Sequence, residues 1–510
     1  RRWPATNWPA TDRAADAAVD HGAADAAVGA EVGALGVEDD DLAAAALIYR
    51  DVRDYVVGHT CAARFVEEGG EVTELGTDWL PTAIVRKPRE TGDPIFDALT
   101  KAGQGEGQDG PLDAKWLSEA PADQMLAGLA QLVALYETWI DAEGVKGEAL
   151  GDPALRARFI VHAATCHATA GRIRAGIALL GHDPHALAAF RLANRAMWLQ
   201  DRWKKDRQDR KDRLTWRPFQ LAFVLLTLCS ASSGTDPDRE VMDLLWFPTG
   251  GGKTEAYLLL TAYVIFLRRL RAAGGPEGAG VTVFMRYTLR LLTIQQFQRA
   301  AAVSLACDLL RRRPDLTGAT LLPGHFATDE PIAIGLWVGA DSVPNRLAEA
   351  IEALTRESLG DQPASNPRRL TRCPQCNGLL HWAANDAKTD LQVTCRGAGC
   401  SLAGAPLPVV TVDDLIYQRL PALMIGTADK YAQLAREPRT GKLFGLGTNH
   451  APPDLIIQDE LHLISGPLGT ISGLYEIAID ELCSHQGNRP KVIGSTATIR
   501  RAETQIRALF

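Results

Sequence analysis

A glycine-rich loop between an apolar segment and a long apolar helix constrains the fold of this chain more than any other feature. The loop reads Phe247-Pro248-Thr249-Gly250-Gly251-Gly252-Lys253-Thr254-Glu255. It follows the run 241–246 and precedes a predicted helix that extends from Thr254 to about Arg271. Successive glycines let backbone N–H groups turn inward around phosphate oxygens, and the helix adds its positive dipole end. The pattern therefore predicts a strand–loop–helix unit that binds a triphosphate such as ATP.

Two polar side chains of this loop have distinct predicted roles. Lys253 would neutralise the β- and γ-phosphates, and the Thr254 hydroxyl would bind Mg²⁺. Phe247 stands where a general Walker A loop has its first glycine, so the match is to a narrower class of loop. The alternative is an incidental glycine-rich turn, which leaves the flanking strand and helix unexplained. The other loop residues expected to contact the nucleotide are Thr249, Gly250, Gly251, Gly252 and Glu255.

Two adjacent carboxylates, Asp459 and Glu460, follow the apolar run Leu455–Gln458. At the carboxyl end of a buried strand, Asp459 would hold Mg²⁺ through water, while Glu460 would orient and deprotonate an attacking water. An Asp-Glu pair alone is common on solvated turns. Combined with the upstream Lys-Thr loop, it predicts a site that hydrolyses ATP.

Alternating strand and helix patterns after Trp216 predict a parallel sheet with helices on both faces. Ligands of such α/β folds bind at the carboxyl ends of the strands, where the loop and the carboxylates fall. We assign this lobe to residues 206–510, a mainly helical accessory domain to 48–205, and a partly disordered or loosely helical Ala- and acid-rich segment to 1–47. The predicted strands are Asp243–Phe247, Val281–Met285, Ile334–Val338, Leu423–Gly426, Leu455–Gln458 and Lys491–Gly494.

Four of the nine cysteines cluster in the sequence. Lys253 and Asp459 lie farther apart than βα units of ~30 residues require, so we expect an insertion, which we place at 360–408. It contains a Cx2C and a Cx4C pair, a spacing typical of a structural zinc ribbon whose four thiolates leave no open metal position. His381 between the pairs is the alternative ligand. The predicted Zn²⁺ ligands are Cys373, Cys376, Cys395 and Cys400.

Charge and hydropathy exclude several classes of protein. The net charge of −8 argues against a surface that binds nucleic acid all over, so such a contact needs a local basic face. No apolar run reaches the roughly 18 residues of a membrane span, and no secretory signal is present, so we expect a cytoplasmic protein without membrane contact. A candidate basic face comprises Arg268, Arg269, Arg271, Arg286, Arg290, Arg299, Arg311, Arg312 and Arg313; ordinary solvated helix ends are the alternative.

The motifs resemble those of superfamily 2 helicases. The glycine loop is similar to their Pro-Thr-Gly-x-Gly-Lys-Thr loop, and Asp459-Glu460-Leu461-His462 is similar to a DEAH-type box with Leu in place of Ala. The resemblance implies a RecA-like first lobe, adenine recognition by Gln220, and coupling of nucleotide and nucleic acid through His462 and the run Ser495-Thr496-Ala497-Thr498. The residues implied to contact the phosphodiester backbone are Arg286, Thr288, Arg290, Gln295, Gln298 and Thr427.

The amino-acid sequence of four segments also resembles that of the helicase subunit of the DISARM anti-phage system (DrmA type). These segments are Trp216–Phe223, Gly250–Glu255, Thr288–Gln298 and Gln458–Thr470. The resemblance implies a bacterial DNA-directed ATPase that works with a partner subunit carrying a DUF1998-type domain. Two other functions stay open: an ATP-gated DNA-binding scaffold or sensor that does not unwind, and an RNA-directed helicase, because backbone contacts discriminate little.

The end of the chain at Phe510, shortly after Thr498, leads us to expect a fragment. Superfamily 2 enzymes hydrolyse ATP between two RecA-like lobes, and the second supplies an arginine finger. We expect that lobe in the missing downstream chain. Loss of a finger costs about 10³–10⁵ in rate, so the fragment should bind ATP far better than it hydrolyses it.

Overall fold

The computed structural model describes residues 46–47, 50, 62–69, 71–78, 94–104, 110–203, 214–247, 250–288, 290–317, 330–487, 489–497 and 502–509. Two compact units are present. The first comprises Arg1–Thr91 and Trp139–His167, and the second comprises Gly92–Thr138 and Ala168–Phe510. Most of the segment 1–47, which we expect to be partly disordered or loosely helical, lies outside the described residues, as do residues 204–213.

The first unit contains an antiparallel pair of strands, β1 (Ala62–Glu68) and β2 (Glu71–Asp78). The pairing register shifts between Val66 and Glu67, which indicates a β-bulge. Val72 is buried, and Arg64 forms an exposed ion pair with Glu74 across the strands. These strands carry no predicted functional residue.

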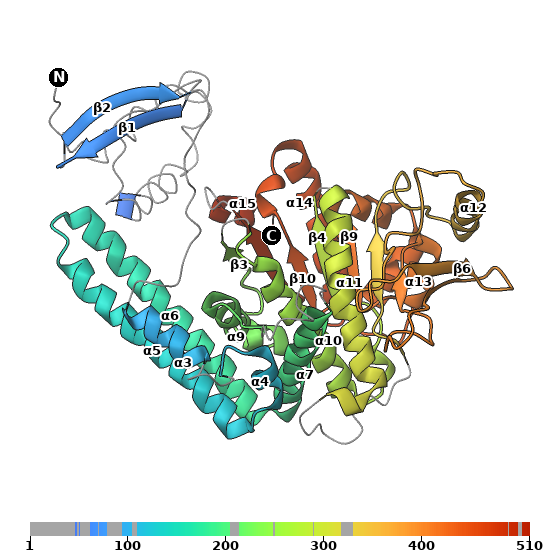
Figure 1. Ribbon diagram of the computed structural model, residues 1–510, viewed down its shortest axis with the longest axis horizontal. Coiled ribbons are helices and arrows are strands. Elements are labelled where there is room, and N and C mark those ends of the chain that lie inside the picture. The colour runs from blue at the N-terminus through green and yellow to red at the C-terminus, as the bar shows by residue number, and fades with distance from the viewer. Residues whose placement is uncertain are drawn as a thin grey trace. The chain divides into compact units, whose positions relative to one another are not determined.

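A parallel sheet of seven strands forms the centre of the second unit, in the order β3-β11-β10-β4-β9-β5-β8 (Figure 1). The α/β class and the six predicted strands are confirmed. The edge strand β8 was not predicted because it has only two residues. The strands are β3 (Asp243–Trp246), β11 (Lys491–Thr496), β10 (Leu455–Gln458), β4 (Val283–Tyr287), β9 (Leu423–Thr427), β5 (Ile334–Trp337) and β8 (Val409–Val410).

Helices cover both faces of this sheet, as its apolar strands require. On one face, α10 (Lys253–Ala272) and α11 (Arg290–Arg312) pack against the strands, with α7 (Pro184–Arg202) and α9 (Pro218–Ser232) packed against α10. The other face forms a core with residues of α13 (Asp413–Arg419), η3 (Ala428–Ala435), η4 (Pro438–Phe444) and α14 (Gly466–Ser484). The shorter helices of this unit are α4 (Ala114–Glu119), α12 (Leu347–Ser358), α15 (Ala502–Leu509), η1 (Pro276–Gly278), η2 (Pro314–Leu316) and η5 (Leu461–Leu463).

Helix α7 lies within the predicted accessory domain 48–205. It packs against α10 and α11 in the same compact unit as the sheet. Its inner face is made of buried small and apolar residues such as Ala189 and Ala193, which let α10 approach closely. The other helices upstream of the sheet are α3 (Pro94–Gln104), α5 (Ala122–Glu148) and α6 (Pro153–His182).

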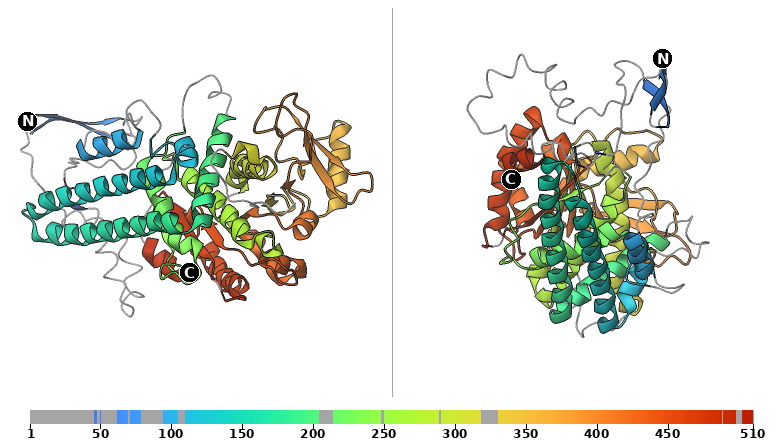
Figure 2. Two further views of the ribbon diagram at one scale, coloured as in Figure 1. Left: turned by 90° about the horizontal axis from the view of Figure 1, so that it is seen from below. Right: turned by 90° about the vertical axis from the view of Figure 1, so that its left-hand side faces the viewer.

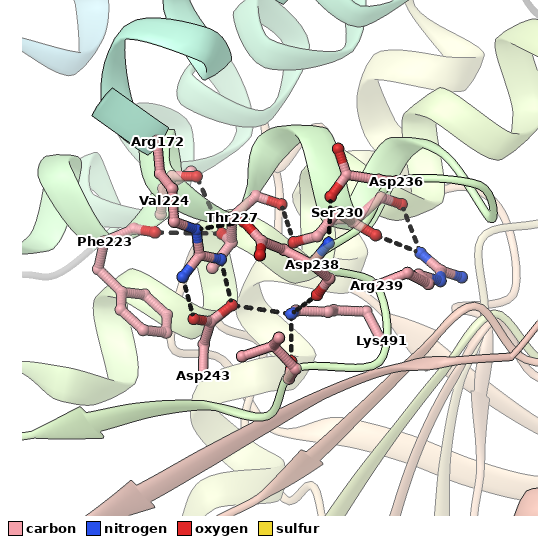
Figure 3. Close-up of polar contacts among 12 residues, drawn as sticks. Arg172, Phe223, Val224, Thr227, Ser230, Asp236, Asp238, Arg239, Asp243 and Lys491 are labelled. Carbon is pink, nitrogen blue, oxygen red and sulfur yellow. Dashed lines mark hydrogen bonds and ion pairs between the residues drawn. The ribbon is translucent and has the colours of Figure 1, made fainter. Parts of the chain in front are cut away.

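A network of charged side chains, of which Asp243 and Lys491 are buried, ties α6 to the amino ends of two neighbouring strands (Figure 3). Asp243, the first residue of β3, accepts two hydrogen bonds from Arg172 at 2.7 and 2.8 Å. The same carboxylate lies 2.8 Å from Nζ of Lys491, the first residue of β11 and fully buried. Arg172 also forms an ion pair with Asp238 at 2.8 Å. One carboxylate therefore balances two cations at the amino ends of β3 and β11, whereas the glycine loop follows the carboxyl end of β3.

The predicted cysteine insertion forms a hairpin of β6 (Leu380–Ala384) and β7 (Leu391–Cys395). It lies beside the β8 end of the sheet, where the Leu407 amide donates to the Val393 carbonyl at 2.7 Å. Figure 2 shows the hairpin, in orange, beside the yellow-orange helix α12. Among the described residues, no helix combines the length and apolar character that crossing a membrane requires.

Candidate active site

The glycine loop has the backbone conformation that its sequence predicts. Gly250 and Gly252 have φ values of +79° and +91°, in the region that glycine enters without steric cost. Gly252 is the N-cap of α10, so Lys253 is the first helical residue. A Cβ on Gly252 would lie 2.6 Å from Nε2 of Gln220. Both the φ value and this close approach require glycine at position 252. Thr249 lies outside the described residues.

The start of α9 holds the loop in place. Gln220 donates from Nε2 to the Gly252 carbonyl at 2.7 Å, and Arg217 donates from Nη1 to the Gly251 carbonyl at 2.8 Å. The Arg217 amide in turn donates to Oε1 of Gln220 at 2.9 Å. Adenine recognition by Gln220 stays a prediction, whereas its contact with the loop is observed. The role of Arg217 was missed, although it lies in the motif that identified Gln220.

Lys253 points back into the loop, where its Nζ donates to the Phe247 carbonyl. Burial lowers the pKa of Lys253, and the nearby carboxylates of Glu460 and Asp459 oppose that shift. The ammonium therefore contacts the Phe247 carbonyl and lies near the two predicted catalytic acids.

The two carboxylates lie just beyond the carboxyl end of β10. Asp459 is 5% exposed, its amide donates to the Arg286 carbonyl at 3.1 Å, and its Oδ1 accepts from the Glu460 amide at 2.9 Å. Glu460 has a φ of +49°, which is unusual for a residue with a side chain and is typical of strained functional positions. Burial raises the pKa of Glu460, and Asp459 adds to the shift. A more basic carboxylate is better suited to accept a proton from water.

The predicted Mg²⁺ ligands converge on one buried phenol. Tyr257 lies 2.7 Å from Oδ2 of Asp459 and 3.1 Å from Oγ1 of Thr254. Hydroxyl and carboxylate oxygens are ligands that Mg²⁺ accepts, so this donor set fits the ion. On the outer side, Arg299 contacts Oγ1 of Thr254 at 3.3 Å and forms an ion pair with Glu255. Neither Tyr257 nor Arg299 was predicted to be part of the site.

The predicted coupling residues lie next to Glu460. Nδ1 of His462 is 3.0 Å from Oγ1 of Thr496 and 3.5 Å from Oε2 of Glu460. Ser495 is fully buried, and the Ala497 carbonyl accepts a hydrogen bond from the Trp246 indole at 3.2 Å. Thr498 lies outside the described residues.

The six residues implied to contact nucleic acid do not form one exposed face. Arg286 is 2% exposed and forms an ion pair with Glu476 of α14 at 2.5 Å, and Thr427 is 0% exposed. Both belong to central strands whose side chains are covered by helices, so the structure does not place them on the surface. Gln295 and Gln298 are exposed on α11, and Thr288 is half-buried beyond β4. The side chain of Arg290 lies outside the described set.

Burial and ion pairs remove further arginines from the predicted basic face. Arg268 and Arg269 are 9% and 4% exposed and donate to backbone carbonyls of neighbouring loops. Arg311 and Arg312 form ion pairs with Asp308. These arginines therefore stabilise the lobe from within, because their guanidinium groups satisfy carbonyls and a buried carboxylate.

Four cysteine sulfurs form a compact cluster at the base of the β6–β7 hairpin. The Sγ atoms of Cys373, Cys376, Cys395 and Cys400 all lie within 4.8 Å of one another. The distances are 3.8 Å from Cys373 to Cys400 and 3.5 Å from Cys376 to Cys395. Tetrahedral zinc with Zn–S bonds of about 2.3 Å separates its sulfurs by about 3.8 Å, so the donor set fits Zn²⁺. His381 is exposed on β6 and outside the cluster.

Comparison with known proteins adds one informative relative. No protein-family model matches the chain. The chain is 33% identical over 524 residues to the DISARM protein DrmA of Bacillus paralicheniformis. The alignment covers 91% of this chain but only 45% of the relative, so the chain spans less than half of the length of that protein.

Proposed function

Because this chain belongs to the DrmA family of DISARM proteins, we propose that it provides the ATP-binding lobe of a DNA helicase or translocase in bacterial anti-phage defence. The reaction is hydrolysis of ATP, and in the whole protein contact with DNA stimulates it. Other DISARM subunits are the expected partners, including one with a DUF1998-type domain, and the second RecA-like lobe is expected from the remainder of the whole protein.

One observation carries this proposal: Thr254 of the glycine loop and Asp459 of the distant carboxylate pair meet at a single phenol, with Lys253 and Glu460 beside them. Thr254 and Asp459 would hold Mg²⁺, which neutralises charge on the phosphates. Lys253 binds the β- and γ-phosphates. Glu460 orients water and accepts its proton, a role supported by its raised pKa.

We assign a structural Zn²⁺ to the cysteine cluster. Four thiolates complete a tetrahedral shell and leave no position for substrate, so the ion would stabilise the hairpin and take no part in hydrolysis. The hairpin contacts the sheet beside β8, away from β10 and its carboxylates.

The test is DNA-stimulated ATP hydrolysis by the whole protein. Lys253→Ala should weaken nucleotide binding, and Glu460→Gln should preserve binding but lower turnover by at least about a hundredfold, because a general base is lost. Lys442→Ala, at an exposed position of η4, is the matched control. Hydrolysis that survives both site variants contradicts the proposal.

The same preparation separates the motor from the sensor alternative. A motor uses ATP hydrolysis to displace a DNA strand or to translocate along DNA. A scaffold or sensor changes its DNA affinity with nucleotide but displaces nothing. The intact Glu460 supports the motor, since a sensor has less need of a hydrolytic base. Replacing DNA by RNA of the same sequence tests the RNA-directed alternative.

A further inference from the structure

Tyr257 is a fully buried residue on α10, one turn after the glycine loop. Its hydroxyl contacts three oxygens, one on the first turn of α10 itself, one just after β10 and one at the end of β4. These are Oδ2 of Asp459 at 2.7 Å, Oγ1 of Thr254 at 3.1 Å and the hydroxyl of Tyr287 at 3.3 Å. The first two of these oxygens belong to the proposed Mg²⁺ ligands.

The chemistry of a phenol decides the direction of these hydrogen bonds. A phenol has one proton to donate, and an ionised carboxylate can only accept. The Tyr257 proton therefore goes to Asp459, its nearest partner, in a charge-assisted bond. The Tyr257 hydroxyl also lies within donor distance of Oγ1 of Thr254, at 3.1 Å, so one O–H group lies between the two proposed ligand oxygens and contacts both.

The contact with Tyr257 restricts the position of the Thr254 hydroxyl, whose oxygen would bind a cation through a lone pair. The Arg299 guanidinium donates to the same oxygen at 3.3 Å, so a second side chain holds the Thr254 hydroxyl in place. Tyr257 also fixes Asp459, the other proposed ligand, through its carboxylate.

We propose that Tyr257 is a positioning residue that sets the Mg²⁺ affinity of the nucleotide site by orienting both Thr254 and Asp459. The proposal rests on the proposed function. The alternative is a core tyrosine with a satisfied hydroxyl and no effect on the metal. Tyr263, on the same helix, is such a residue: it is equally buried and its hydroxyl lies 2.6 Å from Oγ of Ser232, a residue outside the proposed ATP site.

The test compares Tyr257→Phe with Tyr263→Phe in the whole protein. Binding of a fluorescent, non-hydrolysable ATP analogue is measured at increasing free Mg²⁺ and in excess chelator. Loss of a residue that orients metal ligands typically costs 10–100-fold in metal affinity, so Tyr257→Phe should raise the half-saturating Mg²⁺ concentration by at least about tenfold. Affinity in chelator should stay unchanged. Tyr263→Phe should keep the wild-type Mg²⁺ dependence.

An unchanged Mg²⁺ midpoint in Tyr257→Phe, or an equal shift in both variants, overturns the proposal. If Tyr257→Phe does not fold, Tyr287→Phe provides the second test, because it removes a contact of the phenol but neither ligand; we expect a smaller shift in the same direction, and no shift overturns the assignment. If the wild-type protein binds no nucleotide, or binds it without regard to Mg²⁺, the proposed function itself fails, and this proposal fails with it.

Discussion

Nδ1 of His462 lies 3.0 Å from Oγ1 of Thr496 and so joins the segment after β10 to the end of β11. The same ring approaches Glu460 at 3.5 Å. Because the imidazole contacts both the proposed general base and a neighbouring strand end, a movement of β11 would change the position of Glu460. The contact provides a short physical connection between the proposed nucleotide site and β11.

We therefore predict that His462→Ala and Thr496→Val each reduce DNA-stimulated ATP hydrolysis by about tenfold, the equivalent of one hydrogen bond of roughly 1.5 kcal/mol. ATP binding should change little. Since both variants break one interaction, the double variant should be no worse than either single one. His485→Ala, at the exposed end of α14, is the control. Additive losses in the double variant would contradict a shared role.

The buried Arg286–Glu476 pair gives a prediction about stability. Glu476→Gln leaves a guanidinium buried without its counter-charge, which costs about 3–5 kcal/mol of unfolding free energy. Replacing both partners, as Arg286→Met with Glu476→Leu, should recover most of that loss. Urea unfolding of the three proteins measures the difference. A Glu476→Gln protein as stable as the wild type would show that the pair contributes nothing.

The same double variant tests whether Arg286 contacts DNA, as the motif resemblance implies. The guanidinium is 2% exposed, so a structural role predicts that the folded double variant binds DNA as the wild type does. A large loss of DNA affinity in that variant, measured by fluorescence anisotropy, would instead support the nucleic-acid contact.

Apolar runs with polar residues at their carboxyl ends were sufficient to predict six strands and to place the glycine loop and the carboxylate pair at strand ends, because these signals are local. The environment of Arg286, in contrast, depends on residues that lie far away in the sequence. A basic residue near the end of an apolar run is typical of a surface contact, and its partner Glu476 lies 190 residues away in the sequence. Tyr257 was missed for a similar reason: a tyrosine in an apolar helix indicates core packing, and only the fold brings Asp459 to it.

The carboxylate of Asp243 balances Arg172 and Lys491 at the edge of the sheet (Figure 3). We predict that Asp243→Asn lowers the unfolding free energy by about 3–5 kcal/mol, because it leaves two cations at a buried site without their shared partner. Asp238→Asn should cost less than about 1 kcal/mol, since Asp238 is 37% exposed. Chemical unfolding distinguishes the two. Equal losses of unfolding free energy in the two variants would show that the burial of Asp243 does not determine the cost of removing its charge.

Asp183 links pH to stability at the start of α7. It accepts from the amides of His185 and Ala186 and from Arg271 at 2.8 Å. Burial raises its pKa, but Arg271 and the two amides outweigh burial and lower the pKa below its ordinary value. The stabilisation is therefore fully present above the unfolded pKa of about 3.9 and is lost as pH falls through the folded pKa.

Asp183→Asn, which retains a capping oxygen but no charge, should accordingly be less stable than the wild type at pH 7 by up to about 1 kcal/mol, as expected for a partly exposed ion pair. The difference should shrink as the pH falls below the unfolded pKa of about 3.9 and vanish once the carboxyl group is protonated in the folded protein. Urea midpoints at several pH values provide the measurement, with Asp386→Asn in an exposed turn as the control. A difference that persists unchanged at low pH would show that the charge is not its source.

The cysteine cluster should bind one zinc ion per chain. Metal analysis of the purified protein measures the stoichiometry, and Cys395→Ser should lower it to near zero because three remaining thiolates hold Zn²⁺ less tightly. Since metal binding and local folding are coupled, the variant should become more sensitive to proteolysis between β6 and β7 while it still binds ATP. Cys166→Ser, outside the cluster, should retain the ion. Zinc that stays bound in Cys395→Ser, or ATP binding that is lost together with the metal, would contradict a purely structural zinc at this end of the sheet.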